Sequence, residues 1–267
     1  MDPLTKKRAH RKLNTIKEYI GYPEEILNNT ALEELYKGLE VEPTTYFQNG
    51  ISMSIWSTNY HWKKLREKVD KTDWKRHANP AVVNAFYSSI ENSIQFPAGI
   101  LQGIFFNQDR PSYLNYGGIG WVIGHEITHG FDDQGRQYDA DGNLRNWWEP
   151  ETFKEFLHKT TCIIGQYGNY TAPQVGMKLN GINTQGENIA DNGGIKEAYR
   201  AYREYNFQQT GLTWMLISCP FHLFLRRAFC QEGGRGAVAA GPLDEPESVV
   251  LAVGSQHVVL QVPPQVA

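Results

Sequence analysis

The sequence predicts an α+β fold that is mainly helical and contains a small β-sheet. Three observations support this class: apolar residues recur at helical spacing early in the chain, two β-prone runs follow within residues 82–96, and helical patterns return after residue 119. The chain has 267 residues, 40% of them hydrophobic, so it is long enough to bury a substantial core.

Residues 1–80 are expected to form a helical segment that precedes the core. Its first helix is indicated by four apolar residues at three- and four-residue spacing, followed by a glycine: Ala9, Leu13, Ile16, Ile20 and Gly21. A short helix is expected over residues 31–39, with Asn29 or Thr30 as its N-cap. A longer helix is expected between residues 43 and 68.

Residues 81–206 are expected to form the core of the fold. Two β-prone runs, Val82–Tyr87 and Ser93–Phe96, are separated by a polar turn of the length found in β-hairpins. Helices are expected at three further places: around Ile119–Asp133, at Pro150–Tyr167 and at Glu187–Tyr205.

The composition of the chain changes near residue 207. Residues 211–267 contain no Lys, Asn or Tyr, although the chain as a whole has 14 tyrosines. Several stretches of this part have the composition of a linker. We expect residues 207–267 to be a divergent and poorly ordered tail.

Charge and short motifs limit the partners and the location. A formal net charge of −3 leaves no basic excess for binding phosphates, so no nucleic-acid partner is expected. Residues 1–12 lack the apolar run of a secretory signal. Asn28 and Asn169 each begin an N-glycosylation acceptor pattern, which points to an exported parent protein.

The sequence His125-Glu126-Ile127-Thr128-His129 is an H-E-x-x-H pattern inside an apolar run. On a helix, residues four apart lie on one face, so both imidazoles can reach the same metal ion. Glu126 is displaced by about 100° around the helix axis and can instead reach a water molecule bound to that ion. The pattern predicts a metal site with Glu126 as the general base.

A catalytic zinc site needs a third protein ligand, and Glu187 is the natural candidate. It opens an expected helix, and Asp191 lies one turn further along the same face. Asp191 and Asp132 can each accept a hydrogen bond from the outer nitrogen of a ligand histidine. Taken alone, Glu187 is more typical of an acidic residue at a helix N-terminus than of a metal ligand, and Asp191 is more typical of a solvated side chain. The H-E-x-x-H pattern favours the ligand interpretation.

Several longer motifs together resemble the neprilysin and endothelin-converting-enzyme family of zinc metallopeptidases. The resemblance covers about residues 12–205 and is carried by four segments: Val83–Tyr87, Phe96–Gln102, His125–Arg136 and Gly186–Tyr202. It implies a thermolysin-like zincin core with one Zn²⁺ per chain, ligated by His125, His129 and Glu187.

The resemblance also implies an activity and a location. It implies cleavage of peptides on the amino side of hydrophobic residues, with Glu126 and Asp191 as catalytic residues. It further implies that Asn84 and Ala85 hold the backbone of an extended substrate, the binding mode of an edge strand. The parent protein is expected to be membrane-anchored, and the location to be the extracellular face of the plasma membrane or the secreted space.

The chain also departs from the family. Family members have a histidine that stabilises the oxyanion and an arginine that binds substrate, both downstream of the third ligand, and neither motif is recognisable after Tyr205. Loss of one oxyanion donor typically lowers the rate about 10²- to 10³-fold. Two functions are therefore open: a zinc metalloendopeptidase, or a catalytically silent zinc- or peptide-binding fragment of one. The sequence specifies neither the physiological substrate nor the oligomeric state.

Overall fold

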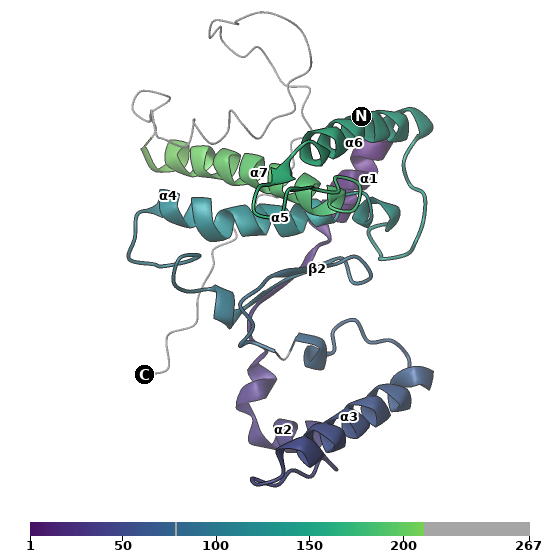
Figure 1. Cartoon of the computed structure of the whole chain (residues 1–267), viewed down its shortest axis with the longest axis vertical. Coiled ribbons are helices and arrows are strands. Elements are labelled where there is room, and N and C mark those ends of the chain that lie inside the picture. The colour runs from purple at the N-terminus through teal and green to yellow at the C-terminus, as the bar shows by residue number, and fades with distance from the viewer. Residues whose placement is uncertain (78, 211–267) are drawn as a thin grey trace, which may run out of the picture.

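The computed structural model describes residues 1–77 and 79–210. Most of the divergent tail predicted for residues 207–267, from residue 211 to the end, lies outside the described residues. The described part is mainly helical with small sheets, as predicted (Figure 1). In chain order the helices and strands are α1 (Pro3–Asn14), β1 (Lys17–Gly21), α2 (Asn29–Leu35), α3 (Tyr46–Lys63), β2 (Phe86–Ser88), β3 (Ser93–Pro97), α4 (Ser112–Asn115), α5 (Trp121–His129), α6 (Pro150–Gly168), β4 (Thr171–Ala172), β5 (Met177–Lys178) and α7 (Gln185–Thr210). A short π-helical turn, Tyr116–Gly120, leads directly into α5.

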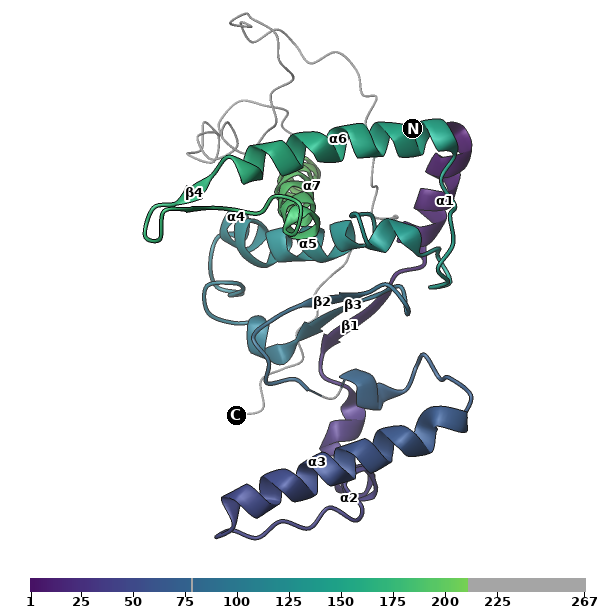
Figure 2. The ribbon, with the colours of Figure 1, turned by 45° about the vertical axis from the view of Figure 1, so that its right-hand side comes forward.

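The main sheet has three strands in the order β1-β3-β2 and lies below α5 in Figure 2. The predicted hairpin is present, with β2 and β3 antiparallel and Phe86 opposite Gln95. Its first strand begins at Phe86 rather than Val82. Residues 80–82 instead pack their backbone against the turn at Gly99, where the Gly99 N–H donates to the Pro80 carbonyl at 2.8 Å.

The predicted first helix is too long at its C-terminal end. α1 ends at Asn14, and the following residues form β1, which pairs in parallel with β3. Ile16 packs against the apolar cluster between the sheet and α5, and Ile20 lies opposite Phe96. Ile16 and Ile20 fit the helical spacing, but both are β-branched and so also favour a strand. Pairing with β3 therefore decides the structure of this segment. Gly21 ends the strand with φ +80°.

The predicted cap of the short helix is also one residue off. The N-cap of α2 is Asn28, whose side-chain oxygen accepts hydrogen bonds from the backbone of Thr30 and Ala31. Asn28 has extended backbone angles, which an N-cap requires, whereas Asn29 is already helical.

The helices predicted at 150–167 and 187–205 are present as α6 and α7. The domain boundaries at residues 80 and 206 stay predictions.

Two apolar clusters hold the helices around the sheet. One lies between the sheet and α5 and contains Ala85, Ile94, Phe96, Ile100 and Ile119. The other joins α1 to the segment before α6 and contains Ala9, Trp147 and Trp148. Among the described residues, no helix combines the length and apolar character needed to cross a membrane.

α5 and α7 pack closely because glycines lie at their contact (Figure 2). A Cβ built on Gly194 would lie 2.6 Å from the Trp121 carbonyl oxygen and 2.7 Å from the His125 backbone nitrogen. A Cβ on Gly193 would overlap the side chain of Thr128. The two helix backbones can therefore approach each other only where these residues lack a side chain.

We predict that Gly194→Ala lowers the free energy of unfolding by about 1–3 kcal/mol because the added methyl group has no space. Gly165→Ala is the matched control, since Gly165 is also helical and has nothing within 4 Å of its added Cβ. That change should raise stability by about 0.5–1 kcal/mol. Urea unfolding in the presence of a chelator measures both. A stabilising effect of both substitutions would contradict the close packing.

Candidate metal centre

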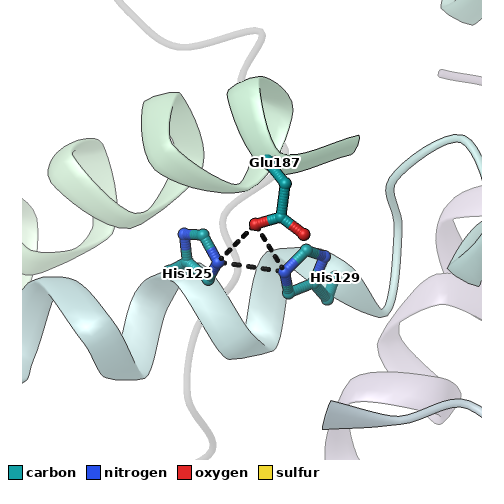
Figure 3. Close-up of side chains that lie close together, drawn as sticks. All are labelled: His125, His129 and Glu187. Carbon is teal, nitrogen blue, oxygen red and sulfur yellow. Dashed lines mark hydrogen bonds and ion pairs between the residues drawn. The ribbon is translucent and has the colours of Figure 1, made fainter. Parts of the chain in front are cut away.

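The two histidines of the H-E-x-x-H pattern lie one turn apart on α5 and face the same point in space (Figure 3). Their Nε2 atoms are 2.9 Å apart, and both side chains are largely buried. The helix spacing predicted from the sequence is therefore present in the structure.

Glu187 approaches this pair from the first turn of α7, where the helix dipole favours a carboxylate (Figure 3). Its Oε2 atom lies 3.4 Å from the Nε2 atom of His125 and 3.6 Å from that of His129. Within the described part of the chain, these three residues form the one group of His, Cys, Asp or Glu side chains arranged to hold a metal ion. Glu187 comes from a segment 58 residues beyond His129, and the contact of α5 with α7 brings the two together.

Two further carboxylates orient the imidazoles. The Nδ1 atom of His125 lies 2.9 Å from Asp191 Oδ1, and the Nδ1 atom of His129 lies 2.7 Å from Asp132 Oδ2. A carboxylate can only accept, so each Nδ1 carries the proton and donates it. Each Nε2 atom is then left with a free lone pair directed at the centre of the group.

This arrangement fits a bound cation. Two unprotonated Nε2 atoms at 2.9 Å cannot form a hydrogen bond with each other, since both are acceptors. A cation between them satisfies both lone pairs and the Glu187 carboxylate. Two imidazoles and one carboxylate are a ligand set of catalytic zinc sites, which leave a fourth position open.

The negative surroundings also affect His129. Burial acts to lower the pKa of His129, but the hydrogen bond and charge of Asp132, together with the charges of Glu126 and Glu187, raise it overall. Surroundings that favour a positive imidazolium also favour a positive metal ion. The electrostatic and geometric observations therefore agree.

Glu126 lies next to the metal-ligand group but is not part of it. It is only 6% exposed, and this burial raises its pKa, although the neighbouring His129 and His125 act to lower it. A buried carboxylate with a raised pKa binds a proton more readily than a solvated one. The environment of Glu126 thus suits a group that accepts and returns a proton.

Asn84 and Ala85 lie immediately before β2, the edge strand that packs beside α5. Ala85 is buried in the core, whereas Asn84 is exposed and its side-chain oxygen accepts a hydrogen bond from the Ala85 N–H at 2.9 Å. The outer edge of β2 pairs with no other strand in the described residues. Their role in substrate binding stays a prediction.

The sequence reasoning did not identify the residues that allow α5 and α7 to meet. Gly193 and Gly194 lie in a motif of the family resemblance that assigns them no role, and Gly124 of α5 faces Gly194, with an added Cβ 2.8 Å from the Gly194 Cα. The signal was present, since two adjacent glycines inside a helical pattern weaken the helix and so indicate a packing requirement.

Comparison with known proteins gives a consistent result. A profile described as "Peptidase family M13" matches residues 84–215. Neprilysin-2 of Drosophila melanogaster is 62% identical over 205 residues, and human neprilysin is 53% identical over 207 residues. Each alignment covers 77% of this chain but only 26% and 27% of the respective relative.

Solved structures show the same similarity at lower identity. The zinc metalloprotease Zmp1 of Mycobacterium tuberculosis, solved with an inhibitor, matches with a TM-score of 0.72 and 35% identity, covering 86% of this chain and 34% of that one. PepO from Lactobacillus rhamnosis matches with a TM-score of 0.66 and 36% identity, covering 75% of this chain and 30% of that one.

The fold and the His-His-Glu group together define the class of H-E-x-x-H metallopeptidase cores. Within this class, the chain belongs to peptidase family M13, the neprilysin family. It spans about a quarter of the length of the curated relatives it matches.

We predict that Asp191→Ala weakens zinc binding by about 10- to 100-fold, because His125 then lacks the acceptor that fixes its proton and ring. Asp109→Ala is the control, since Asp109 is exposed and lies in the loop that precedes α4. Competition with a chromophoric chelator measures both affinities. Equal affinities for the two variants would show that Asp191 does not orient the site.

Proposed function

We propose that this chain is a zinc metalloendopeptidase, or the catalytic portion of one, that hydrolyses peptides on the amino side of hydrophobic residues. The observation that carries the proposal is the convergence of the His125, His129 and Glu187 ligand atoms beside the buried Glu126 carboxyl. The family supports the reaction type.

In this proposal His125, His129 and Glu187 hold one zinc ion, and Asp191 and Asp132 fix the two imidazoles. Bound zinc supplies Lewis-acid polarisation of the scissile carbonyl and of the attacking water. Glu126 takes the proton from that water and later delivers it to the leaving amine. No covalent intermediate with the enzyme is required, since water is the nucleophile.

The substrate peptide is proposed to bind in an extended conformation along β2. The edge of β2 that pairs with no strand of the described residues offers backbone N–H and C=O groups, and a peptide can add to it as a further strand. Asn84 lies at the start of this edge with its amide exposed, in position to bind a peptide backbone. This arrangement lays the peptide beside α5 and Glu126.

We predict that Glu126→Gln abolishes hydrolysis while retaining about one zinc per chain, because the amide cannot accept the proton. The loss should be at least about 10²-fold, the typical contribution of a general base. Glu151→Gln, at an exposed position on α6, is the control. Cleavage of short hydrophobic peptides, with and without a chelator, is measured together with the zinc content.

The same assay separates the two candidate functions. Chelator-sensitive hydrolysis by the wild-type chain supports the peptidase. Stoichiometric zinc without hydrolysis would instead identify a silent zinc- or peptide-binding fragment.

We further propose that the parent protein passes through the secretory pathway and acts outside the cell. Asn28 and Asn169, which begin the two acceptor patterns, are both exposed. Expression in a secreting eukaryotic cell followed by tryptic mapping should find a glycan on at least one of them. Finding both asparagines unmodified in secreted material would contradict the use of these sites.

A further inference from the structure

The structure contains a buried lysine that the mechanism does not use. Lys12 lies near the end of α1 and is 1% exposed. Its ammonium donates three hydrogen bonds, to the carbonyls of Gly130 at 2.6 Å, Gly135 at 2.7 Å and Tyr138 at 2.8 Å. An ammonium has three N–H groups, so all of its donors are used.

The surroundings of Lys12 are built for a cation. Rings of Phe131, Tyr87 and Trp147 lie 5.4–5.9 Å from the nitrogen. Burial lowers the pKa of Lys12 to about 8, and the charges of Asp132 and Asp139 oppose this effect. The ammonium therefore remains charged at neutral pH. A buried charge is costly unless it is paired and hydrogen-bonded, so this position has a specific requirement for lysine.

The carbonyls bound by Lys12 lie on both sides of Asp132 in the chain. Gly130 precedes Asp132 by two residues, and Gly135 follows it by three. The Oδ1 atom of Asp132 accepts hydrogen bonds from the backbone of Gln134 at 2.9 Å and Gly135 at 2.6 Å. Its Oδ2 atom accepts from the Nδ1 atom of His129. Lys12 thus holds the backbone of the loop of residues 130–138, and the same loop holds the Asp132 carboxylate in place.

We propose that Lys12 is a positioning residue for the metal centre, which acts through the loop of residues 130–138 and Asp132 on the orientation of His129. The inference rests on the zinc site of the proposed function. It assigns to α1, which lies outside the segment matched by the family profile, an indirect effect on metal affinity.

The first test is zinc affinity, measured by chelator competition on the full chain. Lys12→Met keeps most of the side-chain volume but removes the donors, and it should weaken zinc binding by about 10-fold or more. Lys7→Met is the matched control, since Lys7 is exposed on the same helix, and it should change the affinity by less than about twofold. Equal affinities for the two variants would overturn the proposal.

The second test distinguishes positioning from general destabilisation. In the Asp132→Ala background the proposed route to His129 is already broken, so Lys12→Met should weaken zinc binding by less than about twofold further. If the losses caused by the two substitutions multiply, Lys12 does not act through Asp132, and the proposal is wrong.

Folding is checked by circular dichroism and by unfolding in the presence of a chelator. Lys12→Gln, whose amide can still donate to two carbonyls, is the milder variant and should show an intermediate zinc affinity. If neither variant folds, the lysine serves the fold as a whole and the proposal is overturned. Zinc affinity is independent of turnover, so failure of the wild-type chain to cleave peptides would reject the proposed function without deciding this inference.

Discussion

The close contact between α5 and α7 is the constraint on which the site depends. The two histidines lie on α5, and Glu187 and Asp191 lie on α7, so the metal-ligand group forms only where these helices meet. Glycines at the contact allow the backbones to approach. The same crossing sets the distance from Glu187 to both imidazoles and from Asp191 to His125. The packing of α5 against α7 therefore determines whether the metal-ligand group can form.

Environment separates the roles of the two site glutamates. Glu126 is buried beside the site, and its pKa is raised. The Glu187 side chain is 69% exposed and lies in the first helical turn, where a carboxylate is favoured. A carboxylate at the surface is free to bind a metal ion, whereas a buried one with a raised pKa suits proton transfer. The same side-chain chemistry thus serves two purposes, because the fold places one glutamate inside and the other at the surface.

Much of the site could be predicted from the sequence because its parts are local. The four-residue spacing of His125 and His129 fixes their common helix face, and Glu187 and Asp191 are likewise one turn apart. The meeting of α5 and α7 is not local. The ligand requirement of zinc and the family resemblance connect the two motifs, but neither identifies the glycines that permit the contact.

The errors in the predicted fold have a common physical origin. Ile16 and Ile20 fit a helical period, but Ile20 pairs with Phe96 of β3, and Ile16 packs against an apolar cluster that begins at Ala85. Lysine side chains are usually exposed, yet Lys12 is buried against a loop that begins 118 residues later. A period describes which residues share a face, but not which distant segment covers that face. Contacts with distant segments decide the structure both at residues 16–20 and at Lys12.

X-ray absorption spectroscopy at the zinc edge tests the central claim most directly, because it reports the atoms bound to the ion in the intact chain. Loaded with one equivalent of zinc, the protein should show two imidazole nitrogens at about 2.0–2.1 Å and one carboxylate oxygen, with a further light atom from solvent. A sulfur ligand, a single imidazole or a shell of oxygens alone would contradict the account.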